Sequence, residues 1–161
     1  MKKFLGILLC LGTMVLMVGC GEAKEQSATY VLVQEEAGMF TMTDTQTLHA
    51  KGDTVYKLLE TTTLEFAELS DTTLETLITY YDDTVTAIKA SAPEGVEVSS
   101  SYEGSVYIMT INLNLESANL QELVEGGYLM GSDGENAENF TFISFEKTCA
   151  GFEAAGYTLK E

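Results

Sequence analysis

The sequence predicts an α+β domain, in which a mainly antiparallel sheet of about five to six strands carries one long helix and one or two shorter helices on one face. Residues 29–66 alternate apolar and polar side chains and are rich in Thr, which is typical of strands with one solvent-exposed face. Residues 71–90 have apolar side chains at helical spacing, and the alternation returns over residues 96–115. A group of strands, then a long helix, then more strands is an order that indicates α+β architecture.

Three strands are predicted in the first half of the chain. The first starts at Thr29 and ends before a turn at Gly38, the second spans residues 40–50, and the third spans residues 54–66. A Lys-Gly-Asp turn joins the last two strands into a hairpin. The second strand places four Thr residues and His49 on one face, which we expect to be exposed. The third strand is expected to place four apolar side chains on one face: Tyr56, Leu58, Leu64 and Phe66.

The long helix is predicted over residues 71–90. Thr72 and Glu75 have the spacing of a capping box at its start, and Pro93 with Gly95 ends it. The many Thr residues lower its intrinsic helicity, so packing against the sheet must stabilise it. Its apolar stripe consists of Leu74, Leu77, Ile78, Tyr81, Val85 and Ile88.

A second hairpin follows the long helix. Its strands span residues 96–102 and 105–115 and meet at Glu103-Gly104. In the second of these strands, apolar side chains occupy one face and Thr110, Asn112 and Asn114 the other. A short helix over residues 117–125 comes next and stops at a Gly-Gly pair.

The C-terminal part is predicted to contain a loop at residues 131–139 and a helix that stops at Gly156. Residues 140–145 could form a final short strand between them. The helix would carry Phe145, Cys149 and Phe152 on its inner side.

The first twenty residues have the pattern of an export signal. Lys2 and Lys3 precede an apolar run of residues 4–18, which has the length of a signal sequence and is short for a spanning helix. Met17-Val18-Gly19-Cys20 at its end resembles a bacterial lipobox, although Met17 stands where most lipoboxes carry Leu. We therefore predict a lipoprotein signal peptide at 1–19, a tether at 20–28 and a single domain at 29–161.

Lipidation at Cys20 would fix the location of the protein. Two acyl chains on this residue, palmitate among them, suffice for stable anchoring, so we expect the cell membrane to be the partner and the domain to lie on the extracytoplasmic face. The alternatives are an uncleaved N-terminal membrane anchor and an ordinary secreted protein. Cleavage would leave six Lys against 25 acidic residues, a formal charge of −19. Anionic headgroups repel such a domain at close range.

The charge also limits the partners. The chain has eight Lys and no Arg against 25 Asp and Glu, so we exclude nucleic acid, which needs clustered basic side chains. We expect a monomer whose partner is a protein, a component of the cell envelope or a small ligand. The mature chain keeps only Cys20 and Cys149, and acylation of the first rules out a disulfide within the domain.

The sequence predicts no catalytic residues, no metal site and no cofactor. His49 is the only His and falls on the Thr-rich side of its strand, where an exposed structural role is favoured over catalysis. One His and one free Cys cannot supply the four ligands of a zinc site. Cys149 lies between two Phe residues at helical spacing, which favours a buried and unreactive thiol.

Two alternatives to a simple binding role stay open. The first is a cell-wall-acting hydrolase that uses paired carboxylates, with Asp82 and Asp83 assigned to a solvated helix face. The second is a cation-responsive module built on the loop at residues 131–139, which has oxygen ligands around a Gly but not the pattern of an EF-hand. The adjacent or closely spaced acids that motivate the first are Glu35 with Glu36, Asp82 with Asp83, and Glu65 with Glu68.

Several short segments resemble the YehR-like family of small bacterial lipoproteins, a domain of unknown function, and the likeness covers nearly the whole domain. The resemblance supports a lipoprotein with an α+β domain and brings no catalytic signature. The segments are Lys51-Gly52-Asp53-Thr54-Val55-Tyr56-Lys57 with Thr61-Thr62, Tyr80-Tyr81, Gly95-Val96 leading to Ser101-Tyr102, and Phe152 to Glu161. The chain is more acidic than Lys-rich members of that family.

Overall fold

The computed structural model describes residues 23–129 and 141–160. These residues form a six-stranded sheet and three helices, of which only one is long. The predicted α+β class is therefore confirmed. In chain order the elements are β1 (Glu25–Glu36), β2 (Phe40–Lys51), β3 (Thr54–Phe66), α1 (Asp71–Ser91), β4 (Val96–Glu103), β5 (Val106–Asn114), α2 (Leu120–Glu125), α3 (Phe145–Ala154) and β6 (Thr158–Leu159).

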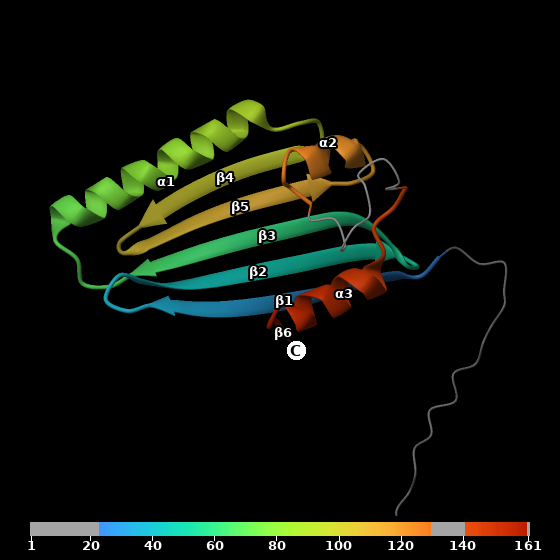
Figure 1. Ribbon diagram of the computed structural model, residues 1–161, viewed down its shortest axis with the longest axis horizontal. Helices are drawn as coiled ribbons and strands as arrows, with labels where there is room; N and C mark the ends of the chain where they lie inside the picture. The colour runs from blue at the N-terminus through green and yellow to red at the C-terminus, as the bar shows by residue number, and fades with distance from the viewer. Residues whose placement is uncertain (1–22, 130–140, 161) are drawn as a thin grey trace, which may run out of the picture.

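The strands lie in the order β4-β5-β3-β2-β1-β6, and every neighbouring pair is antiparallel. Both predicted hairpins are present, and Gly104 turns the second one with a positive φ of 61°. Figure 1 shows α1 running beside β4 on one side of the sheet, while α3 lies near β1 and β2.

The helices cover one face of the sheet, as predicted. The even-numbered residues of β2 all point to this face, and the apolar ones among them belong to, or pack against, the two core clusters. One cluster is built on Leu48, Leu58 and Leu113 and packs against α3, whereas the other packs against α1 and is built on Leu64, Phe66 and Tyr107. We call this the helix face, and the opposite Thr-rich side the open face.

Helix starts differ slightly from the sequence prediction. Ser70, and not Thr72, caps α1, because its side chain accepts a hydrogen bond from the Thr73 N–H at 3.3 Å. The second helix begins at Leu120 with Asn119 as its cap, three residues later than predicted, since the Asn119 side chain accepts from the N–H of Gln121.

Three strand boundaries also differ. β1 begins at Glu25, so residues 25–28 of the expected tether pair with residues 48–51 of β2. Within residues 141–145, the expected short strand is reduced to a single bridge between Ser144 and Thr54, and Phe145 already starts α3. β6, which the sequence did not predict, pairs with Tyr30 and Val31.

Tyr56 lies on the open face, contrary to the prediction. The register between β2 and β3 shifts at His49 and Ala50, so that Ala50 pairs with Val55 while His49 pairs with Lys57. The extra residue in β3 is a β-bulge, and it reverses the side-chain alternation at that point. Val55 consequently takes the core position that the alternation had assigned to Tyr56.

Candidate functional site

Three polar side chains interrupt the apolar helix face midway along the sheet. Asp44 and Gln46 in β2 are only 8% and 6% exposed, and Glu60 in β3 is half-buried. Gln46 pairs directly with Glu60, and Asp44 pairs with Thr62 in the same register. These residues lie between the cluster under α1 and the cluster under α3. The centre of the sheet therefore holds two carboxylates where its two ends hold apolar cores.

Neutral donors hold the Asp44 carboxylate. The Gln46 side-chain amide donates to Oδ1 at 3.3 Å and to Oδ2 at 3.1 Å. The Tyr157 hydroxyl also donates to Oδ2. Tyr157 follows α3 and is fixed there by its N–H bond to the Phe152 carbonyl and by contact of the two rings, whose centroids are 5.1 Å apart. The end of α3 thus supports the buried acid.

The protonation equilibria in this cluster are displaced. Burial, and next the negative charge of Asp44, raises the pKa of Glu60, while a hydrogen bond from Gln46 partly opposes the change. Burial also raises the pKa of the Tyr157 phenol, and the hydrogen bond to Asp44 adds to this effect. Tyr157 therefore stays a neutral donor at physiological pH, and Glu60 holds its proton more readily than an exposed Glu.

An apolar groove of about 120 Å³ lies further along the same face of the sheet, and the two carboxylates are near its lining but not part of it. Thr62 is both part of its lining and the cross-strand partner of Asp44, and Glu60 is two residues away on the same face of β3. Tyr81 of α1 contributes the helix side of the groove. We call the apolar groove and the Asp44–Glu60 pair together the notch. The full lining of the groove is Phe40, Met42, Thr62, Leu64, Tyr81, Tyr107 and Met109.

Asp82 is exposed on α1, in agreement with the prediction of a solvated helix face, and it also helps to position this groove. Its carboxylate accepts hydrogen bonds from the Tyr107 hydroxyl at 2.8 Å and from the Ser100 hydroxyl at 3.4 Å. The Tyr107 and Tyr81 rings lie with centroids 5.5 Å apart. Asp82 therefore ties α1 to the sheet beside the groove, although both Asp82 and the neighbouring Asp83 are exposed.

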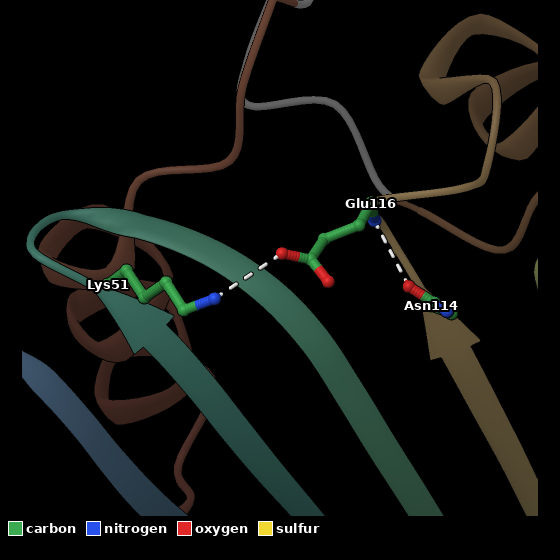
Figure 2. Close-up of polar contacts among 3 residues, drawn as sticks. All are labelled: Lys51, Asn114 and Glu116. Carbon is green, nitrogen blue, oxygen red and sulfur yellow. Dashed lines mark hydrogen bonds and ion pairs between the residues drawn. The ribbon is translucent and has the colours of Figure 1, made fainter.

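His49 lies on the open face, as predicted, and away from the notch. Its ring is 6.2 Å from that of Tyr56, and the Lys51 ammonium lies 4.9 Å from the Tyr56 ring centroid. Figure 2 shows the same Lys51 reaching Glu116 across 3.5 Å, while the Glu116 N–H donates to the Asn114 side chain. These contacts connect the end of β2 to the segment after β5.

Cys149 is partly buried in the core beneath α3. Burial raises the pKa of its thiol, which lowers the thiolate fraction and supports the predicted low reactivity. A hydrogen bond with Cys149, then burial, raises the pKa of Tyr30, whose hydroxyl donates to Glu153 at 3.1 Å.

The other candidate acids lie elsewhere. Glu35, Glu36 and Glu65 line an open depression of about 270 Å³ at the β1–β2 turn, and Glu68 is not part of its lining. Within residues 23–129 and 141–160, no group of three or more His, Cys, Asp or Glu is placed to hold a metal ion. In the same ranges, no helix has the length and apolarity needed to cross a membrane. Cys20 and the loop at 131–139 lie outside the described residues.

The notch was not predicted from the sequence, although a signal for it was present. The helix-face residues of β2 run from Phe40 to Ala50 and are apolar except for Asp44 and Gln46, and those of β3 are interrupted at Glu60 and Thr62. Each interruption alone resembles an ordinary strand irregularity. Their alignment depends on the cross-strand register, which only the three-dimensional structure supplies.

No protein-family model and no curated protein sequence matches this chain. Two solved structures share its fold. An NMR structure of a protein from Streptococcus pneumoniae TIGR4 is 17% identical with a TM-score of 0.55, and the match covers 99% of this chain and 96% of that one. The NMR structure of the Escherichia coli YehR protein is 19% identical with a TM-score of 0.57, covering 85% of this chain and 91% of that one. The chain therefore has the fold of the YehR structure.

Proposed function

We propose that this protein is a lipid-anchored binding module on the extracytoplasmic face of the cell membrane, and that it takes its ligand in the notch. The observation that carries the proposal is a groove lined mainly by aromatic and apolar side chains, in which the lining residue Thr62 pairs with Asp44 and lies two residues from Glu60. Binding sites commonly combine an apolar lining with a few convergent polar groups. Burying Asp44 and Glu60 costs folding free energy, and a binding role accounts for that cost.

The binding role can be tested by photo-crosslinking in intact cells. A photoreactive residue replaces Thr62, which lines the groove, and in a matched control it replaces Thr63, the next residue, on the open face. We expect an adduct, detected by intact mass, from position 62 and none from position 63. Equal labelling at both positions, or labelling at 63 alone, would contradict a ligand site in the notch.

The anchoring part rests on the lipobox pattern that ends at Cys20. Cys20→Ser should release the protein from the membrane fraction and remove the mass of the acyl chains. Cys149→Ser is the matched control and should leave both unchanged. A Cys20→Ser protein that still carries acyl chains would refute the assignment.

A second candidate function, hydrolysis of a wall glycan, is favoured by one observation. Glu60 has a raised pKa beside a second carboxylate, which is the arrangement of a general acid and its partner. In that case Glu60→Gln would abolish release of glycan fragments while Glu103→Gln, at the exposed end of β4, would not. An absence of fragments from the wild-type protein would remove this candidate.

A further inference from the structure

The two halves of the notch lie close enough for one small molecule to occupy both. Thr62 lines the groove and pairs with Asp44, and Glu60 is two residues from Thr62, about 7 Å along the strand. The groove volume of about 120 Å³ is a little smaller than a cavity of ~150 Å³ that binds benzene. The apolar part of such a ligand is thus limited to about one small ring or a short aliphatic chain.

The carboxylates set the charge of that ligand. Among residues 23–129 and 141–160 the one ion pair joins Lys51 and Glu116, so no described Lys lies within 4 Å of Asp44 or Glu60. The Asp44 oxygens receive neutral donors from Gln46 and Tyr157. Two neighbouring acids without a cation favour a positively charged ligand and repel an anion.

From this geometry we infer that the notch binds a small organic ammonium ion, with its apolar group in the groove and its ammonium group against Glu60 and Asp44. The inference rests on the binding function proposed above. An ammonium head supplies several N–H donors to carboxylate oxygens, and its apolar body removes water from the groove. A bare metal ion would use only the carboxylates, and in the described part of the chain no third ligand of the His, Cys, Asp or Glu type joins them.

Three probes of one shape and different charge test the inference: 3-phenylpropylammonium, 3-phenylpropan-1-ol and 3-phenylpropanoate. Each is titrated into the full-length chain, and binding is followed through the NMR signals of the Met42 and Met109 methyl groups, which line the groove. Because the ammonium adds a charge–charge attraction to the carboxylates that the neutral alcohol lacks, we expect the ammonium to bind about tenfold more tightly than the alcohol. The carboxylate probe should bind most weakly.

Variants then assign the preference to Glu60. Glu60→Gln keeps the side-chain shape, removes one negative charge and should abolish the roughly tenfold advantage of the ammonium over the alcohol. Glu103→Gln removes the same charge at an exposed position and should preserve it. Methylammonium lacks the apolar group, so it should not shift the NMR signals of the two methyl groups at concentrations where the larger amine does.

The outcomes separate the two proposals. If the alcohol binds as tightly as the ammonium, or if Glu60→Gln preserves the ammonium preference, the ligand class inferred here is wrong while the groove remains a binding site. If methylammonium binds as well as the larger amine, the apolar group plays no part and the inference also fails. If none of the probes moves the Met42 and Met109 signals, the proposed binding site itself is refuted.

Discussion

At the scale of single residues, the notable feature is an acid placed where apolar side chains would stabilise the fold more. Glu60 is half-buried on the helix face and faces Asp44 and Tyr157, the titratable groups nearest to it, while Gln46 offers partial compensation. Its raised pKa means that the folded state binds more protons than the unfolded state between the two pKa values. Glu60 therefore destabilises the folded protein at neutral pH, and this cost disappears as the pH falls below the unfolded value of about 4.3.

Glu60→Gln should raise the melting temperature at pH 7. The amide has no charge to bury, so the gain should shrink as the pH is lowered and vanish near pH 4. Thermal unfolding of both proteins across this pH range measures the effect. A variant that is less stable than the wild type at pH 7 would show that the Glu60 charge is compensated in the free protein.

Gly95 combines a positive φ with close neighbours, so a side chain at this position should destabilise the fold. Its φ is +85°, and an added Cβ would lie 2.7 Å from the Asn114 carbonyl oxygen and 2.8 Å from the Ala118 Cβ. Gly95→Ala should cost at least about 3 kcal/mol, since a positive φ and a steric clash act together. Gly104→Ala is the matched control, because its φ is +61° with no atom within 4 Å of the new Cβ.

The control should cost only about 1 to 2 kcal/mol, the ordinary penalty for a left-handed residue. Urea unfolding at equilibrium compares the two variants. Equal losses of stability would mean that the segment after β5 moves aside to accept the new methyl group.

At the scale of elements, α3 is attached to the sheet through its first turn. The Asp53 carboxylate, in the β2–β3 turn, accepts hydrogen bonds from the Glu146 N–H at 2.9 Å and the Ser144 hydroxyl at 2.7 Å. Its backbone carbonyl accepts from the Phe145 N–H at 2.8 Å. One turn therefore caps a helix that lies about ninety residues away in the chain, and this gives the Lys-Gly-Asp segment a structural role.

Asp53→Asn should lower stability at neutral pH. The hydrogen bond from the Glu146 N–H, followed by that from Ser144, lowers the pKa of Asp53 in the folded protein. The ionised carboxylate therefore stabilises the fold above the unfolded-state pKa of about 3.9, and this stabilisation is lost as the pH falls through the folded-state pKa. The variant and the wild type should therefore converge at low pH. Amide exchange at Glu146 gives a local reading, and unchanged protection there would contradict the capping role.

Some features of these elements could be predicted from the sequence, and others could not. Local signals are sufficient for α1 and for both hairpins, because helical spacing, turn residues and alternation are read within a few residues. Three features depend on distant partners: the bulge that turns Tyr56 to the open face, the capping of α3 by Asp53, and the pairing of β6 with β1. The notch belongs to this second group, since Asp44 and Glu60 become neighbours only through the register of β2 and β3.

At the scale of the whole molecule, repulsion between like charges is the dominant electrostatic effect. The chain has a formal charge of −17, and one ion pair, between Lys51 and Glu116, is found in the described ranges. That pair is about half exposed at each end and adds little to stability. Self-repulsion of this size opposes the compact state.

Added NaCl should therefore stabilise the fold. Raising the salt concentration from about 0.01 M to 1 M shortens the Debye length from about 30 Å to 3 Å, so most of the repulsion is screened. We expect the melting temperature to rise steeply at low salt and then level off, and KCl should act in the same way. A melting temperature that falls with salt would show that attractive pairs outweigh the repulsion.

The pairing of β6 with β1 has a consequence for how the protein acquires its structure. Thr158 and Leu159 bond to Val31 and Tyr30, and the Lys160 N–H reaches the Thr29 carbonyl, so contacts join positions nearly 130 residues apart. While a chain is being synthesised, the β1–β2–β3 meander can assemble early, but the backbone of β1 keeps an unprotected edge. Sealing that edge is necessarily a late event, and until then a nascent molecule is most vulnerable to pairing with another copy.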